Sequence, residues 1–453
     1  MDIHKEMGTG SIPRLLLKFS LPAITAMLVH SLYNVADSIF VGRGVGELAL
    51  AGVTVSFPIM IILMALTMLI SMGATTLISI RLGEKKGEEA EEIIGNAIIL
   101  FLLVGVSLSV LGLIFIKPLL VMFGASPNVL PYATDYMKIL IPGSVLVTIG
   151  VGMNNFIRAE GNPKTAMYTM LIGSITNIIL DYVFIFIFHW GIKGAAIATV
   201  ISYALSCAWV LNYFLSGNSY LKIRVKNFKL KGDLVKGIAA IGFPAFAMQA
   251  TSSIQNLILN RSLVYYGGDL ALAAVGILIS VATLIVTPVL GISQGAQPII
   301  GFNYGAQQLQ RVKATLKTAI VAATVIVVMG FMVSRIWPAE LIGLFNQNPE
   351  LIKMGTHAML IFFILLPLEG LQIVGAGYFQ AVGKPVQATI LSLSRQVIIF
   401  IPLVFILPRF WGLDGVWWSS PLSDFGAFLL TFIWLRYEFK YALNARKNIS
   451  SLL

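Results

Sequence analysis

The stretch LPAITAMLVHSLYNVADSIFVGR at residues 21–43 is long and apolar enough to cross a lipid bilayer, yet it contains Asp37. A charged side chain at the centre of a bilayer costs about 3 kcal/mol or more. An ionisable residue retained inside a membrane span is therefore a candidate for function. The stretch therefore predicts a membrane helix that carries part of a polar site. Other residues of this site are expected elsewhere in the chain.

Composition places the whole chain in the membrane. Of its 453 residues, 57% are hydrophobic and 11% are charged, whereas soluble domains carry about 25% charged residues. Apolar runs of about 20 residues, the length that spans a bilayer, recur from end to end. A β-barrel would instead show short alternating strands. These features predict an all-α polytopic membrane protein.

We expect twelve transmembrane helices and both termini in the cytoplasm. Most Lys and Arg residues fall at the termini and in alternate loops, which the positive-inside rule assigns to the cytoplasmic side of a bacterial or archaeal cytoplasmic membrane. The net charge of +11 therefore indicates topology, and we expect no nucleic-acid partner. The predicted spans are 14–41, 52–80, 93–116, 129–156, 165–188, 193–216, 235–265, 272–300, 314–337, 352–380, 386–408 and 414–437.

An internal repeat divides the chain. FSLPA at 19–23 matches IGFPA at 241–245, and ELALAGV at 47–53 matches DLALAAV at 269–275, both at a spacing of 222 residues. Six spans in each half predict two lobes related by a pseudo-two-fold axis along the membrane normal, as in known transporters. We expect an N-lobe at 1–216, a basic cytoplasmic linker at 217–234 that lies near anionic lipid, and a C-lobe at 235–453.

A cation site is predicted in the N-lobe. Asp37, Asn177, Asp181 and Thr199 come from three spans at similar depth, and all offer oxygen, the ligand of hard cations. Two close carboxylates also disfavour double ionisation, which suits a proton carrier. The coupling ion is therefore H⁺ or Na⁺. The alternative is that Asp37 only reaches the interface or caps a helix. The repeat argues for function, because hydrocarbon side chains replace these residues in the C-lobe at Leu259, Ile399 and Leu403.

Other polar residues in the spans are candidates for support of the site or for a substrate cleft between the lobes. Glu369 could serve there or could pair with Arg395, and Asp424 is expected to reach the interface from a span end. Span 7 amides could line the cleft or hold helices together. We expect a hinge at Pro22, because proline interrupts the helical hydrogen bonds. The supporting and cleft candidates are Tyr33, Asn34, Met153, Asn154, Gln255, Asn256, Glu369 and Gln372.

Three motifs give the chain a family resemblance: LPAITAMLVHSLYNVADSIFVGR, NPKTAMYTMLIGSITNIILDYVFIF at 162–186 and GIKGAAIATVISYA at 191–204. Together they resemble the MATE family of multidrug and toxin extrusion antiporters, most closely its bacterial MepA-like and DinF-like branch. The resemblance implies a V-shaped pair of lobes and a cation site at Asp37, Asn177, Asp181 and Thr199. Glu369 falls at the position of an acid in the NorM-like branch, but Ser252 stands where that branch has a span 7 glutamate.

The predicted function is a secondary active multidrug efflux antiporter, without an organic cofactor and not an enzyme, that exchanges organic cations or drugs for H⁺ or Na⁺ by alternating access. There is no Walker A motif for ATP. We expect a monomer surrounded by membrane lipid. The alternatives are a flippase for lipid-linked oligosaccharides, which should line its cleft with Arg and Lys, and a non-transporting membrane receptor or assembly factor.

Overall fold

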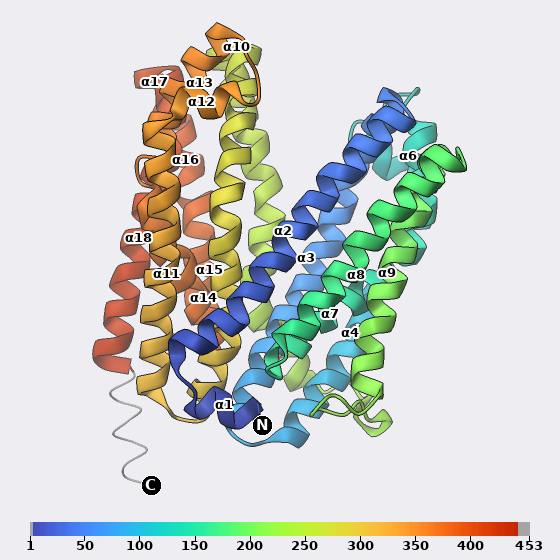
Figure 1. The fold of residues 1–453 in the computed structure, drawn as a ribbon, viewed down its shortest axis with the longest axis vertical. Coiled ribbons are helices and arrows are strands. Elements are labelled where there is room, and N and C mark those ends of the chain that lie inside the picture. The colour runs from blue at the N-terminus through green and yellow to red at the C-terminus, as the bar shows by residue number, and fades with distance from the viewer. Residues whose placement is uncertain (1–2, 443–453) are drawn as a thin grey trace. The chain divides into compact units, whose positions relative to one another are not determined.

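The computed structural model describes residues 3–442, and within that range the chain forms helices and no β-strand (Figure 1). The helices of the first half are α1 (Ile3–Thr9), α2 (Ile12–Gly44), α3 (Glu47–Gly83), α4 (Gly87–Ile114), α5 (Ile116–Met122), α6 (Leu130–Leu140), α7 (Ser144–Ala159), α8 (Pro163–Tyr182) and α9 (Gly191–Leu215). Those that follow are α10 (Gly232–Gly305), α11 (Leu309–Ile336), α12 (Pro338–Gly343), α13 (Pro349–Phe362), α14 (Glu369–Ala381), α15 (Pro385–Leu393), α16 (Phe400–Ile406), α17 (Pro408–Trp411) and α18 (Leu413–Tyr437).

Nine helices within residues 3–442 are long and apolar enough to cross a membrane, and the number is ten if the bent pair α13–α14 is counted as one span. One of the nine, α10, has 74 residues. At 1.5 Å per residue it would measure roughly 110 Å, far more than the ~30 Å of a hydrocarbon core. Its backbone leaves the helical region at Gly268, between predicted spans 7 and 8. The count of twelve spans stays a prediction.

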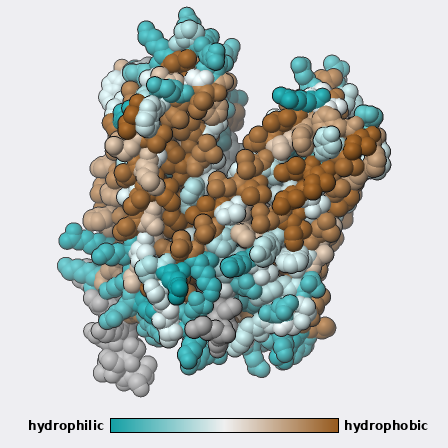
Figure 2. Space-filling model, in the orientation of Figure 1, coloured by the Kyte–Doolittle hydropathy of each residue, from teal (hydrophilic) through white to brown (hydrophobic). Residues whose placement is uncertain are grey.

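Apolar side chains cover the middle of the helices, and hydrophilic side chains gather at their ends (Figure 2). This is the distribution that a bilayer imposes, because polar side chains are stable only at its two aqueous surfaces.

The described chain forms two compact units. Among the described residues, the first comprises 3–10 and Leu21–Phe246, and the second comprises Ser11–Ser20 and 247–442. The first turns of α2 thus pack with the second unit, and the first turns of α10 pack with the first unit. The two exchanged segments, 11–20 and 232–246, occupy nearly equivalent places in the repeat. The lobe boundaries at 216 and 235 stay a prediction.

The internal repeat is visible in the backbone. Gly46 has φ 115° and Gly268, 222 residues later, has φ 66°. Lys85 has φ 62° and Gln307, at the same spacing, has φ 60°. Positive φ is uncommon for residues with a β-carbon, so its recurrence at Lys85 and Gln307 shows that the same helix-to-helix turn is built twice.

Each of the two turns has a contact between the same pair of positions, but the arginine stands at the first position in one turn and at the second position in the other. In the first half, Arg81 Nε lies 2.9 Å from Glu89 Oε2. In the second half, Arg311 Nε donates to Asn303 Oδ1 at 3.0 Å. Residues 303 and 311 are the repeat equivalents of 81 and 89. The guanidinium therefore comes from the helix before the turn in the first half and from the helix after it in the second half, and the same two positions are in contact in both.

Proline breaks two of the predicted spans. Pro142 lies in the 3₁₀ segment Ile141–Gly143, between α6 and α7, and Pro367 lies in the 3₁₀ segment Leu366–Leu368, between α13 and α14. The second pair of helices is bent by 41°. Pro22 lies inside α2, which is helical from Ile12 to Gly44, and its role as a hinge stays a prediction.

Candidate cation site

Packing at the end of α2 directs Asp37 toward α8. Val41 lies one helical turn after Asp37, on the same face, and is fully buried in a core cluster that includes Ile185 and Ile192. The adjacent ring of Phe40 meets Phe186 edge to face, with ring centroids 5.7 Å apart. The α2 face that carries Asp37 therefore lies against the segment at the end of α8.

Asp37 and Asp181 form a carboxylate pair. Asp181 on α8 is fully buried, Asp37 on α2 is half-buried, and their side chains interact with each other. Within residues 3–442, Asp37 Oδ1 and both carboxyl oxygens of Asp181 have no hydrogen-bond partner. Two ionised carboxylates so placed repel each other, and a bound proton or cation would relieve this repulsion.

Asn177 and Thr199 supply the amide and the hydroxyl. Asn177 lies one turn before Asp181 on α8, and its Nδ2 donates to Thr199 Oγ1 at 3.2 Å. Thr199 is on α9, and its hydroxyl donates to Ala195 O at 2.9 Å. Both side chains are buried, and Asn177 Oδ1 has no partner among the described residues. The structure therefore brings the four predicted residues together from α2, α8 and α9.

The donor set fits a proton or a hard monovalent cation. Carboxylate, amide and hydroxyl oxygens are hard ligands. Within residues 3–442, no three His, Cys, Asp or Glu side chains are grouped to hold a metal ion. An ion bound here would therefore be held by the two carboxylates together with Asn177 Oδ1 and the hydroxyl oxygen of Thr199.

Three tyrosines lie near the pair, and only Tyr33 among them was predicted from the sequence. Tyr33 on α2 and Tyr203 on α9 lie beside each other and beside Asp37. Tyr136 on α6 is buried and interacts electrostatically with both Asp37 and Asp181. Tyr203 is four residues after Thr199 on α9, and this helical spacing could have revealed it. No local pattern points to Tyr136, because α6 reaches the site only through the tertiary fold.

The remaining candidate residues lie on α2, α7 and α10. Asn34 is exposed and donates to His30 O at 2.9 Å. It opens onto a groove of about 630 Å³ whose other lining residues are Val35, Ser38, Ile39, Gly42, Arg43 and Leu50. Met153 and Asn154 on α7 are buried in the first unit. In the second unit, Gln255 is half-buried and Asn256 is exposed on α10.

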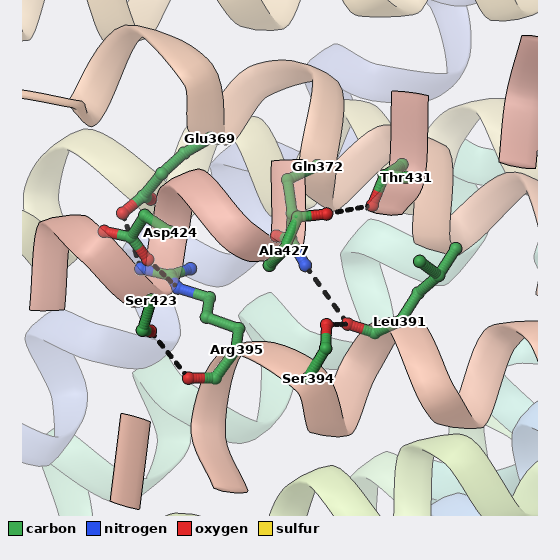
Figure 3. A network of polar contacts seen from close by, with 9 residues as sticks. All are labelled: Glu369, Gln372, Leu391, Ser394, Arg395, Ser423, Asp424, Ala427 and Thr431. Atoms are coloured by element: carbon green, nitrogen blue, oxygen red, sulfur yellow. Dashed lines mark hydrogen bonds and ion pairs between the residues drawn. The ribbon is translucent and has the colours of Figure 1, made fainter. Parts of the chain in front are cut away.

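A buried ionic network occupies the second unit (Figure 3). Arg395 donates from Nη2 to Glu369 Oε1 at 2.5 Å and from Nε to Asp424 Oδ1 at 2.6 Å. Glu369 and Asp424 are 6% and 5% exposed. The structure therefore confirms the alternative in which Glu369 pairs with Arg395. The expectation that Asp424 reaches the interface is wrong, because the guanidinium of Arg395 holds it inside the unit.

Two further contacts fix this network. Ser423 Oγ donates to Arg395 O at 2.8 Å, which ties α18 to the π-helical segment Ser394–Ile398. Gln372 Nε2 reaches Leu391 O at 3.5 Å, one helical turn beyond Glu369 (Figure 3). Gln372 therefore binds α14 to α15, as expected of amides that hold membrane helices together.

Many apolar spans together with a buried carboxylate pair are typical of a multi-pass membrane transporter. Comparison with protein families agrees: the MatE family model matches residues 22–183 and again residues 244–406. The chain belongs to the MatE family. The two matches begin 222 residues apart, which confirms the duplication predicted from the sequence.

Individual proteins give the same result. The chain is 30% identical over 425 residues to the multidrug export protein MepA of Staphylococcus haemolyticus, covering 94% of this chain and 93% of that protein. It resembles a multidrug resistance MATE family transporter of the MOP superfamily, solved in an outward-facing conformation, with 25% identity, coverage of 97% and 98%, and a TM-score of 0.91. A MATE structure in the bent conformation gives 25% identity, coverage of 100% and 99%, and a TM-score of 0.92. The predicted all-α membrane fold is confirmed.

Proposed function

We propose that the chain is a secondary active antiporter that exports organic cations and drugs in exchange for H⁺ or Na⁺. The observation that carries this proposal is the Asp37–Asp181 pair, in which Asp37 Oδ1 and both Asp181 oxygens have no hydrogen-bond partner among the described residues. Membership of the MatE family and similarity to a multidrug export protein support the substrate class. We place the protein in a bacterial or archaeal cytoplasmic membrane with both termini in the cytoplasm.

The coupling ion binds between α2 and α8 in this proposal. Asp37 and Asp181 hold its charge, while Asn177 and Thr199 add an amide and a hydroxyl oxygen. Binding removes the repulsion between the two carboxylates and so favours one conformation of α2. Export requires that ion and drug favour different conformations of the transporter, since coupling is a free energy that the two sites share.

Alternating access then arises from rocking of an N-lobe, 1–216, against a C-lobe, 235–453, with a linker at 217–234. Asn34 and the groove beside it are the first-half surface for the organic cation. The groove is largely apolar, as a site for flat organic cations should be. Pro22 is the position at which α2 bends.

The flippase alternative loses support from the ionic network. An anionic lipid-linked sugar would need free cationic side chains within the spans. Arg395, one of the two arginines that the sequence places inside spans, is held by both Glu369 and Asp424. Arg261, the other, is exposed on α10, so at most one arginine within the predicted spans is free to meet such a substrate.

Ethidium transport by the purified protein in proteoliposomes tests the proposal. A proton gradient alone and a sodium gradient alone are imposed in separate experiments. Transport driven by one gradient identifies the coupling ion. Absence of transport under both gradients, with the protein folded and inserted, would contradict the antiporter and favour the flippase or a non-transporting role.

A further inference from the structure

The basic linker between the two halves is folded onto α4. Arg224 Nε lies 2.7 Å from Glu91 Oε2, and Lys231 Nζ lies 2.7 Å from Glu92 Oε2. The backbone nitrogen of Lys231 donates to Asn96 Oδ1 at 2.8 Å. Two cations and one backbone group of the linker are therefore bound at the start of α4.

The backbone of the linker touches the helix directly. A β-carbon added to Gly95 would lie 2.4 Å from the backbone oxygen of Asn227. Leu221 is 1% exposed, and Asn227 is also buried. One side of the linker is thus fixed against α4 along the row from Glu91 to Asn96.

The other side of the linker combines apolar and cationic side chains in solvent. Val225 is 82% exposed, and Phe228 is also exposed. Lys226 and Lys229 alternate with them and are exposed. Within residues 3–442, no ion pair is recorded for either lysine. Exposed apolar side chains interleaved with free cations are typical of segments that bind a membrane surface.

The position of the linker on α4 places it at the edge of the bilayer. Helical periodicity puts Glu92, Asn96, Leu103 and Val110 on one face of α4. Leu103 and Val110 are about half exposed, so this face is the lipid-facing one. Asn96 precedes Leu103 by roughly 10 Å along the helix axis. Lys231, bound to Glu92 and Asn96, therefore lies where the apolar surface ends and the lipid headgroups begin.

We propose that residues 222–231 form a binding surface for the headgroups of anionic phospholipids. Lys226 and Lys229 contact the phosphates, and Val225 and Phe228 enter the interfacial layer beside them. Arg224 and Lys231 are neutralised by Glu91 and Glu92 and serve to hold the linker in place. The surface binds lipid whichever ion drives transport, so the proposal stands apart from the proposed function.

Lipid retention by the full-length protein tests this surface. The protein is equilibrated in micelles that contain phosphatidylcholine and phosphatidylglycerol, and native mass spectrometry counts the lipids that stay bound. In the variant with Lys226→Gln and Lys229→Gln, the affinity for phosphatidylglycerol should fall about fivefold for each lysine removed. Retention of phosphatidylcholine should not change. Val225→Asn, which alters no charge, should also weaken retention of phosphatidylglycerol.

The control variant carries Lys85→Gln and Lys317→Gln, two exposed lysines outside the linker. It has the same change in net charge, and Lys85→Gln installs the residue type found at the equivalent position, Gln307, in the second half. The control should retain phosphatidylglycerol as the wild type does. Equal loss in the control, or wild-type retention in the linker variant, would overturn the proposal. Thermal unfolding in phosphatidylcholine micelles verifies that each variant is folded.

Discussion

Asn177 Nδ2 on α8 donates to Thr199 Oγ1 on α9 across 3.2 Å, and the Thr199 hydroxyl donates in turn to Ala195 O at 2.9 Å. The hydroxyl proton is thereby used within α9, and its oxygen holds the amide nitrogen of Asn177. The amide is fixed with Oδ1 on the opposite side, where it has no partner among the described residues. In the proposed site, Thr199 therefore orients Asn177 so that its amide oxygen can face the ion.

Loss of this orientation should weaken ion binding. Thr199→Val keeps the shape of the side chain but removes the acceptor for Asn177. A hydrogen bond of this kind is worth about 1 kcal/mol, so the ion concentration that half-saturates ethidium export should rise about fivefold. Ser202→Ala is the matched control, because Ser202 is buried on the same helix and, among residues 3–442, its hydroxyl bonds only to Ala198 O, at 2.7 Å. An unchanged ion dependence in Thr199→Val would remove Thr199 from the site.

The Glu369–Arg395–Asp424 network should stabilise the second unit only as a whole. Arg395→Met leaves two buried carboxylates without a counter-charge, and breaking a buried ion pair in this way costs about 3–5 kcal/mol. The thermal unfolding midpoint in detergent should therefore drop markedly. Adding Glu369→Gln and Asp424→Asn to Arg395→Met should restore most of it, because no buried charge remains. An Arg395→Met variant as stable as the wild type would contradict this role.

The carboxylate pair could be predicted from the sequence, because the depth of a residue in the membrane follows from the number of residues between it and the end of its span. Asp37, Asn177 and Asp181 each sit a few residues from a predicted span end, so their common level could be counted. The same count misjudged Asp424, since its partner Arg395 is on another helix and 29 residues away in the sequence. Tyr136 was missed for a related reason: only the packing of α6 brings it to Asp37.

Glu160, in the turn between α7 and α8, should make stability depend on pH. Burial raises the pKa of its carboxyl, although Tyr213, Ser219 and Leu221 donate to it. A carboxyl whose folded pKa exceeds its unfolded pKa stabilises the fold below the unfolded pKa, and this contribution is lost as pH rises through the folded pKa.

The difference between wild type and Glu160→Gln measures this contribution. Thermal unfolding midpoints are compared from acidic to neutral pH. The wild type should lose stability relative to the variant as the pH rises above the usual range of a carboxyl group. Glu89→Gln, which removes a half-exposed carboxylate paired with Arg81, is the control for the change in net charge. A parallel pH dependence in wild type and Glu160→Gln would show that Glu160 does not titrate as proposed.

Gly95 should tolerate no side chain. In Gly95→Ala the new β-carbon meets the backbone oxygen of Asn227 at 2.4 Å, and backbone cannot rotate away as a side chain can. We expect the linker to detach, with a loss of about 1–3 kcal/mol and faster cleavage by a protease between residues 217 and 231. In Gly87→Ala the nearest atoms belong to Tyr220 at 3.7 Å, an ordinary contact. That control should be cleaved as slowly as the wild type.

The central claim is that Asp37 and Asp181 couple the ion to the drug. The most direct measurement compares two modes of ethidium movement in proteoliposomes: exchange at equilibrium and accumulation driven by the effective ion gradient. Asp37→Asn and Asp181→Asn should lose the driven accumulation and keep exchange, because the drug surface remains while ion binding is lost. Glu369→Gln serves as the comparison at a carboxylate held by Arg395, and it should keep both modes. Driven accumulation at the wild-type level in Asp37→Asn and Asp181→Asn would contradict the account.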